Sequence, residues 1–179
     1  MDELIDIYDG NGNHIGSELR SIVHAQGLWH RTAQVWLLNE KNELLLQFRS
    51  KHKDCFPELW DISSAGHIPA ACPPLTSALR ELEEELGVKA SERELIYLFE
   101  HVDPYEDSRT GHIDKEFSEV YLLKVSSNIQ MTLQKEEVEK VRWIHYKSLL
   151  EDYNKNPAVY VPHEKHFYKL VKAIDGLVE

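Results

Sequence analysis

Residues 66–88 of the chain read GHIPAACPPLTSALRELEEELGV, and this stretch decides the central element of the fold. Pro73 and Pro74 suit the start of a helix, where a missing backbone N–H leaves no hydrogen bond unmade. Gly87 suits the end of the same helix, because glycine readily adopts the left-handed conformation found there. We therefore predict one helix between them, directly after a glycine turn at Gly66.

The predicted helix separates apolar from acidic side chains. With about 100° of rotation per residue, four leucines form one stripe and three glutamates gather on another side. The leucines are Leu75, Leu79, Leu82 and Leu86, and the glutamates are Glu81, Glu84 and Glu85. Like charges three or four residues apart repel one another, so a cation is expected beside them. Carboxylate oxygens favour Mg²⁺ or Mn²⁺, although a solvated acidic helix face would give the same pattern.

The spacing of this stretch resembles the Nudix box, G-x5-E-x7-R-E-U-x-E-E-x-G-U, in which U is a bulky aliphatic residue. Each fixed position matches except Cys72, which stands where the pattern has glutamate. The resemblance implies that metal is bound by three glutamates and by the carbonyl of a glycine, here Glu81, Glu84, Glu85 and Gly66. It also implies that Glu81, or a carboxylate outside the box, activates water, and that Arg80 holds a neighbouring carboxylate such as Glu84 in position. Cys72 predicts weaker metal binding or a slower enzyme.

Composition favours one compact domain over residues 1–179. The chain has 179 residues, of which 42% are hydrophobic and 28% charged, enough for one core. It contains no apolar run near the ~20 residues of a membrane span, and its acidic start, MDELIDIYDG, differs from a signal peptide. We therefore expect a cytoplasmic protein with two free thiols, Cys55 and Cys72. The net charge of −11 disfavours nucleic acid polymers as partners but not small phosphorylated substrates.

Alternating and helical patterns elsewhere predict a mixed sheet with helices. Strands are expected at residues 3–8, 14–20, 32–38, 43–49, 95–102, 116–125 and 141–146, with a loop and short strand at 56–63. Helices are expected at 147–153 and 163–175. Residues 103–115 are predicted to form a polar loop that acts as a specificity lid. By resemblance the fold is α/β, a Nudix-type α/β/α sandwich with a mixed sheet and the box helix.

Two further segments narrow the resemblance. GLWHRTAQVWLLN, residues 27–39, and KDCFPELWDISSAGH, residues 53–67, resemble the Nudix branch that includes isopentenyl diphosphate isomerase. The resemblance implies a second metal site made of histidines and carboxylates, here His24, His30, His67, Asp114 and Glu116. A lone histidine is more often a surface or core residue, so this second site stays an open alternative. The isomerase has a cysteine directly before its Gly-His pair, whereas this chain has Ala65, and hydrolysis is therefore favoured over isomerisation.

The substrate contacts are less clearly marked. Arg49 is expected to grip the distal phosphate, because a planar guanidinium can bind two oxygens at once, and His67 is expected beside the substrate. Glu116 and Glu119 lie three apart in a predicted strand and should face opposite ways, and we assign Glu116 to the metals. Three hypotheses remain: a hydrolase of a nucleoside diphosphate derivative or an isoprenoid diphosphate, an isopentenyl diphosphate isomerase, and a catalytically weak binding module. Similar proteins include homodimers, which this sequence neither requires nor excludes.

Overall fold

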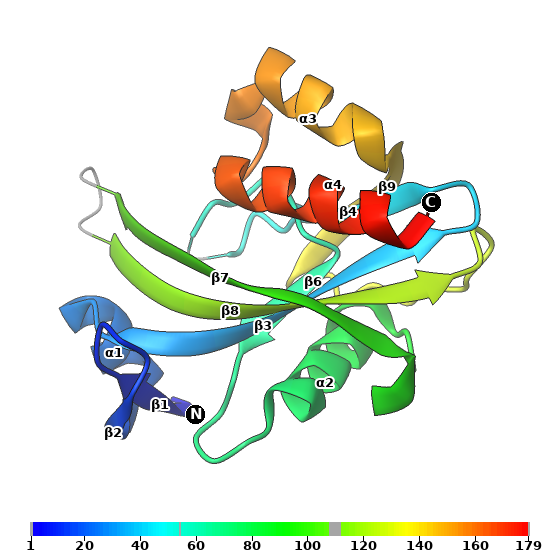
Figure 1. The fold of residues 1–179 in the computed structure, drawn as a ribbon. Helices are drawn as coiled ribbons and strands as arrows, with labels where there is room; N and C mark the ends of the chain where they lie inside the picture. The colour runs from blue at the N-terminus through cyan, green and yellow to red at the C-terminus, as the bar shows by residue number, and fades with distance from the viewer. Residues whose placement is uncertain (1, 54, 108–111, 179) are drawn as a thin grey trace.

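The computed structural model describes residues 2–53, 55–107 and 112–178, and these residues form a sheet between two helical layers (Figure 1). The strands within these ranges are β1 (Leu4–Tyr8), β2 (His14–Leu19), β3 (Trp29–Asn39), β4 (Glu43–Arg49), β5 (Trp60–Asp61), β6 (Ser64–His67), β7 (Leu95–Asp107), β8 (His112–Val125) and β9 (Val138–His145). The α-helices are α1 (Arg20–Gln26), α2 (Pro74–Leu86), α3 (Tyr146–Lys155) and α4 (Glu164–Val178). Short 3-10 turns span Glu92–Glu94 and Pro157–Val159.

Strand β3 organises the sheet. It pairs antiparallel with β1, β4 and β6 and parallel with β8 over its whole length. Strand β7 extends the sheet beyond β8, and β9 extends it beyond β4. Helix α2 covers one face of this mixed sheet, and α3 and α4 cover the other (Figure 1). The predicted α/β sandwich with a mixed sheet is therefore confirmed.

The core lies on both faces of the sheet. Val35 and Leu37 pack with Leu82 and the rest of the α2 side, whereas Leu44 and Leu46 pack on the side of α3 and α4. All four of these residues, from the strands predicted at 32–38 and 43–49, are buried. The register pairs Leu38 with Leu44, so successive side chains of both strands alternate between two separate cores.

Helix α2 has the predicted position and ends. It begins at Pro74 and ends at Leu86, and Gly87 follows with φ 67°. The N–H of Gly87 donates to the carbonyl of Glu83, and the N–H of Val88 donates to that of Leu82. An added Cβ at Gly87 would lie 2.9 Å from the Cβ of Thr132, so both the backbone angle and the space require glycine. Leu82 and Leu86 are fully buried under the sheet, as the apolar stripe predicted.

The polar loop predicted at residues 103–115 is wrong over most of its length. Strand β7 continues to Asp107, β8 begins at His112, and the backbone pairs from Asp103 with Glu116 out to Asp107 with His112. The apex, residues 108–111, lies outside the described residues. An antiparallel ribbon that leaves the core needs backbone pairing but no apolar side chains, so a polar sequence did not mark a loop here. The prediction of a specificity lid assumed a loop at these residues, whereas the described ones belong to paired strands.

Two other segments shape the surroundings of α2. Helix α1 was not predicted, and it places His24 next to strand β3 and ends at Gly27, whose φ is 59°. Strand β1 braces the segment before α2, because the N–H of Ala70 donates to the carbonyl of Leu4 and the N–H of Ala71 donates to Asp6. No helix within the described ranges is long and apolar enough to cross a membrane.

Candidate metal and substrate site

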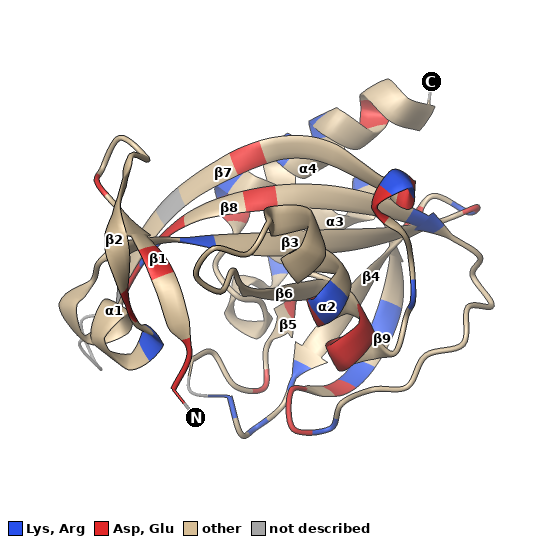
Figure 2. Cartoon of the chain, turned by 90° about the horizontal axis from the view of Figure 1, so that it is seen from below, with Lys and Arg blue, Asp and Glu red and all other residues tan. Residues whose placement is uncertain are grey.

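Gly66, which precedes α2 in the chain, leaves space for the side chain of Glu81 from that helix. An ideal Cβ built on Gly66 would stand 2.1 Å from Cδ of Glu81, so the side chain of Glu81 occupies the volume that any other residue would fill. The predicted turn at Gly66 is wrong, because Gly66 lies in strand β6, which pairs with β3, and α2 packs directly against this strand. Acidic and basic segments stand side by side on α2, next to β6 (Figure 2). The predicted approach of Gly66 to the glutamate face is therefore present.

Two of the three glutamates are largely withdrawn from water. The side chain of Glu81 is 15% exposed, and Glu85 is 3% exposed. Glu85 accepts hydrogen bonds from the side-chain amide of Gln47 and from the N–H of Ala65, each 3.2 Å long. Burial raises the pKa of each carboxyl group to about 7. Such a pair is the kind of site that a bound cation would stabilise, since the cation favours the charged carboxylates.

Arg80 connects the remaining glutamate to this pair. Its guanidinium donates to Glu81 at 2.7 Å and to the carbonyl of His67 at 3.3 Å, and it lies 3.6 Å from Glu84. Glu84 itself is half exposed, at 52%. Arg80 thus contacts its predicted partner Glu84 but lies closer to Glu81. The helix thus presents Glu85 buried, Glu81 largely covered and Glu84 at the surface, and Arg80 links Glu81 to Glu84.

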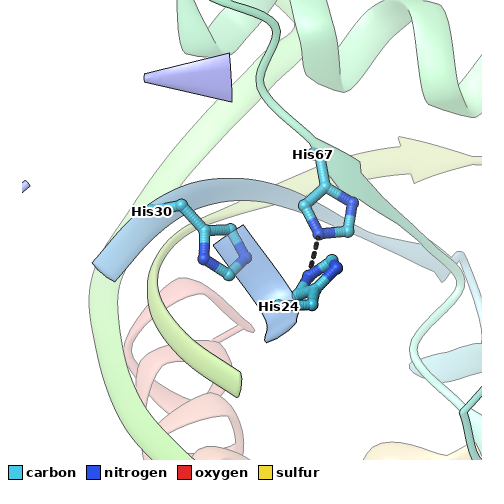
Figure 3. A group of neighbouring side chains, drawn as sticks. All are labelled: His24, His30 and His67. Atoms are coloured by element: carbon cyan, nitrogen blue, oxygen red, sulfur yellow. Dashed lines mark hydrogen bonds between the residues drawn. The ribbon is translucent and has the colours of Figure 1, made fainter. Parts of the chain in front are cut away.

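A second cluster gathers residues from four elements. His24 from α1, His30 from β3 and His67 from β6 turn their rings toward one another (Figure 3). Ring nitrogens of these three lie within 4.8 Å of one another, and so do ligand atoms of His30, Asp114 and Glu116. Three imidazoles with two carboxylates suit a divalent transition metal. The cluster that the isomerase resemblance left open is thus assembled in space.

Electrostatics in this histidine cluster separate its two carboxyl groups. Burial would raise the pKa of Glu116, but the hydrogen bond and charge of His30 hold that pKa down, at about 2. Burial and the charge of Glu116 raise the pKa of Asp114 to about 7. Burial also keeps the pKa of His67 well below its ordinary value, so its ring stays neutral and able to bind a metal.

Glu116 belongs to the histidine cluster rather than to the helix glutamates in the contacts that it makes. It lies 3.7 Å from Nε2 of His30, and it accepts hydrogen bonds from Thr32 at 3.1 Å and Ser118 at 3.4 Å. Glu119 points to the other face, where it contacts Arg31 and Tyr121. The predicted opposite orientation of the two glutamates is confirmed. The grouping of Glu116 with the box carboxylates at one metal stays a prediction.

Arg49 is held by the chain itself. Its guanidinium donates to Asp61 at 2.8 Å and to the carbonyls of Cys55 and Phe56, at 2.8 to 3.2 Å. Burial would raise the pKa of Asp61, but His163, at 3.0 Å, and Arg49 keep that pKa far below its ordinary value. These contacts fix the loop that follows β4. A phosphate contact by Arg49 stays a prediction, and it would use the N–H groups that these partners leave.

The sequence did not connect two groups, Gln47 and Lys53, with Glu85. Gln47, on β4, donates to its carboxylate, and the positive charge of Lys53 opposes the effect of burial on its pKa. Lys53 also forms an ion pair with Glu137, from the segment that precedes β9. Alternation along β4 could have indicated that Gln47 faces α2, since it lies two residues beyond the buried Leu45. No local signal connects Glu137 with the helix.

Cys72 packs near the start of α2 rather than pairing with another cysteine. It forms no disulfide with any described residue, in agreement with the prediction for this cysteine. Its sulfur accepts a hydrogen bond from Oγ of Ser77 at 3.3 Å and it packs against the core on the α2 side.

The sequence is similar to known proteins over most of its length. Residues 28–167 match a family model described as the NUDIX domain. A protein of Arabidopsis thaliana named Nudix hydrolase 3 is 40% identical over 168 residues, which are 91% of this chain and 22% of that protein. The chain thus spans about a fifth of this relative's length. An isopentenyl-diphosphate Delta-isomerase of Serratia proteamaculans is 31% identical over 158 residues, 88% of this chain and 84% of that protein.

Solved structures agree on the fold. The crystal structure of a Deinococcus radiodurans protein superposes with a TM-score of 0.73, covering 93% of this chain and 98% of that one. The two sequences are 21% identical, so this likeness describes the arrangement of strands and helices alone.

Proposed function

The chain belongs to the Nudix family, and from this membership we propose that it is a divalent-metal-dependent hydrolase of a small substrate that contains a diphosphate. The proposed cofactor is Mg²⁺ or Mn²⁺, held by Glu81, Glu84 and Glu85 with the carbonyl of Gly66. The organic part of the substrate is a nucleoside or an isoprenoid. The relative named as a hydrolase supports the reaction class, and the relative named as an isomerase supports a diphosphate substrate.

One observation carries the proposal: two carboxyl groups of one helix, Glu81 and Glu85, are withdrawn from water beside β6, and Gly66 leaves the space that Glu81 occupies. Without a cation, burial raises the pKa of Glu81 and Glu85 to about 7, so two groups would be held partly protonated in a largely dry site. Burying two carboxyl groups without a partner destabilises the folded chain relative to apolar side chains at the same positions. A bound cation would offset this cost. A hard cation fits oxygen donors of this kind.

Glu81, Glu85 and Arg80 have different roles in the proposed hydrolysis. A bound divalent ion would neutralise diphosphate oxygens and lower the pKa of water. Glu85 is fixed by Gln47 and the N–H of Ala65 and therefore holds its position, whereas Glu81 is the more accessible of the two buried carboxylates and accepts the proton of the attacking water. Arg80 keeps Glu81 oriented through their 2.7 Å hydrogen bond.

A substrate panel tests this function. Purified protein with Mg²⁺ is mixed with nucleoside di- and triphosphates, dinucleotides and isopentenyl diphosphate, and released phosphate or monophosphate is measured. Glu85→Gln should lower the rate by roughly 10²- to 10³-fold. Glu83→Gln is the matched control, because Glu83 lies on the same helix, is exposed and pairs with Lys89. Equal rates for wild type and Glu85→Gln would overturn the site, and ligand affinity without any turnover would point to a binding module.

Isomerisation is the second candidate, and the histidine cluster favours it. The cluster of His24, His30, His67, Asp114 and Glu116 is what the isomerase resemblance implied. The residue before Gly66 is Ala65, whose methyl group can neither donate nor accept a proton. We therefore expect no dimethylallyl diphosphate from isopentenyl diphosphate, and its formation in a Mn²⁺-loaded sample would make this candidate the better one.

A further inference from the structure

Gln47 directs its side-chain amide from the sheet toward α2. It lies on β4 two residues beyond Leu45, whose side chain packs in the core on the α2 side. Gln47 is 2% exposed, and its Nε2 donates to Oε2 of Glu85 at 3.2 Å. Its own amide oxygen has no hydrogen-bond partner among the described residues. A buried amide with an unused acceptor destabilises a fold relative to an apolar side chain. The hydrogen bond to Glu85 is therefore what a leucine at this position could not supply.

The same oxygen of Glu85 receives a second hydrogen bond. The N–H of Ala65 donates to Oε2, also at 3.2 Å. The two donors lie on β4 and β6, which both pair with β3, so the sheet fixes their positions. The hydroxyl of Ser64 opposes the effect of burial on the pKa of Glu85, but its oxygen has no hydrogen-bond partner among the described residues. Both hydrogen bonds thus end on Oε2 and leave Oε1 for a ligand.

The other glutamates of the proposed cation site are held differently. Arg80 donates to Glu81 at 2.7 Å and lies 3.6 Å from Glu84, and the side chains of these two glutamates are 15% and 52% exposed. A guanidinium on a long side chain can move when a cation binds, whereas a strand N–H and a buried amide are fixed. Glu85 is therefore the carboxylate whose orientation the fold determines.

The number of oxygens that a carboxylate offers affects which cation it binds. Ca²⁺ takes about six to eight oxygen ligands and accepts both oxygens of one carboxylate. Mg²⁺ is smaller, requires nearly octahedral geometry and keeps several waters, and Mn²⁺ takes similar ligands. Because two N–H donors occupy Oε2, Glu85 offers one oxygen. Such a carboxylate is a better ligand for Mg²⁺ or Mn²⁺ than for Ca²⁺.

We propose that Gln47 determines which divalent cation this site accepts, because it holds Glu85 as a ligand with one available oxygen. The inference rests on the proposed function and adds to it a positioning residue that acts through Glu85 and favours Mg²⁺ or Mn²⁺ over Ca²⁺. With an apolar side chain at position 47, the N–H of Ala65 would be the hydrogen-bond donor left to Oε2 among the described residues. The carboxylate could then turn and offer both oxygens.

The test measures cation binding without substrate. Electron paramagnetic resonance of free Mn²⁺ gives the affinity of wild type and of Gln47→Met, which removes the amide at similar volume, and competition gives the affinity for Ca²⁺. All proteins carry His67→Ala, so that the histidine cluster contributes no Mn²⁺ site. Gln47→Met should bind Mn²⁺ about tenfold more weakly and Ca²⁺ within about twofold, so the preference for Mn²⁺ falls at least about fivefold. Gln34→Met, at a buried amide that faces away from α2, is the control and should keep both affinities.

A double substitution shows whether Gln47 acts through Glu85. Glu85→Gln combined with Gln47→Met should bind Mn²⁺ no more weakly than Glu85→Gln alone. Additive losses, or an unchanged preference for Mn²⁺ over Ca²⁺ in Gln47→Met, would overturn the inference. A lower melting temperature of Gln47→Met with unchanged Mn²⁺ affinity would also overturn it and leave Gln47 a structural residue.

The same measurements separate this inference from the hydrolysis on which it rests. If Mn²⁺ affinity depends on Gln47 but wild type hydrolyses no diphosphate, the hydrolase proposal fails and the role of Gln47 stands. If wild type hydrolyses a diphosphate and Gln47→Met binds both cations as wild type does, only the inference fails. Absence of Mn²⁺ binding at the helix glutamates would overturn both.

Discussion

The two clusters of ionisable residues in this protein are built in different ways. The glutamates of α2 come from one helical turn and a half, and their convergence follows from helical geometry. The histidine cluster takes His24 from α1, His30 from β3, His67 from β6 and its two carboxylates from β8. One cluster therefore depends on local structure and a single glycine, whereas the other depends on the correct docking of four elements. Substitutions should affect them separately.

The largest expected effect is at the glycine. Gly66→Ala puts a Cβ where Glu81 lies, so the flexible end of Glu81 must swing away while the backbone stays. We expect hydrolysis to fall roughly 10²- to 10³-fold with a melting temperature within a few degrees of wild type. Gly176→Ala, in α4, is the control, because nothing lies within 4 Å of its added Cβ. Full activity in Gly66→Ala would contradict the role of Glu81.

The next largest effect is the pH dependence of the free energy of unfolding, which Glu85 of the helix cluster should influence. In the metal-free protein the pKa of Glu85 rises from 4.5 to about 7 through burial, so between these values the folded chain binds more protons than the unfolded chain. Its contribution therefore lowers stability as the pH rises from 5 to 8, on the order of 3 kcal/mol. Urea unfolding at both pH values measures it.

Substitution isolates this contribution from the other titrating groups. Glu85→Gln should be less sensitive to pH than wild type over the same interval, since it carries no proton to lose. The exposed Glu83→Gln should follow wild type. Saturating Mg²⁺ should remove much of the difference, because bound metal favours the charged carboxylate. An identical pH slope in wild type and Glu85→Gln would show that Glu85 titrates normally.

Breaking the histidine cluster should leave the helix cluster working. His67→Ala removes one of three imidazoles, and we expect Mn²⁺ or Zn²⁺ to bind there at least about tenfold more weakly while hydrolysis falls less than about tenfold. Equilibrium titration with the metal, together with the hydrolysis rate, reports both effects. Unchanged metal stoichiometry and affinity would remove the second site. A loss of hydrolysis as large as that of Glu85→Gln would show that the clusters act as one.

The smallest effect concerns the position where this chain departs from the box. Cys72→Glu restores the box carboxylate, and we expect a two- to tenfold gain in rate or in Mg²⁺ affinity through added negative charge near the helix. The change also removes the hydrogen bond from Ser77 to the sulfur, which limits the gain. Cys72→Gln supplies the same shape without charge and separates the two effects. If Cys72→Glu is no faster than Cys72→Gln, the missing negative charge at position 72 does not slow the enzyme.

What could be predicted from the sequence depended on the range of the interactions. Most strands and helices of the sandwich, though not α1 or β6, were recognised within a few residues because their hydrophobic periods are local. The ribbon of β7 and β8 was not, since the pairing of Asp103 with Glu116 bridges polar residues that no core selects. The partners of Arg49 likewise come from a loop and a short strand, and one of them, Asp61, is also contacted by His163, just before α4. The sequence around a charged residue does not indicate whether its side chain faces solvent or an internal partner.

The sequence by itself determined the box helix, its leucine stripe and the convergence of Glu81, Glu84 and Glu85. All of these follow from a rotation of about 100° per residue and from residues that start and end a helix. Only the tertiary structure decided that Glu85 is buried against Gln47, that Glu116 lies beside His30, and that His30 meets His24 and His67. These contacts join residues distant in the chain, and their geometry depends on strand register, which no local pattern encodes.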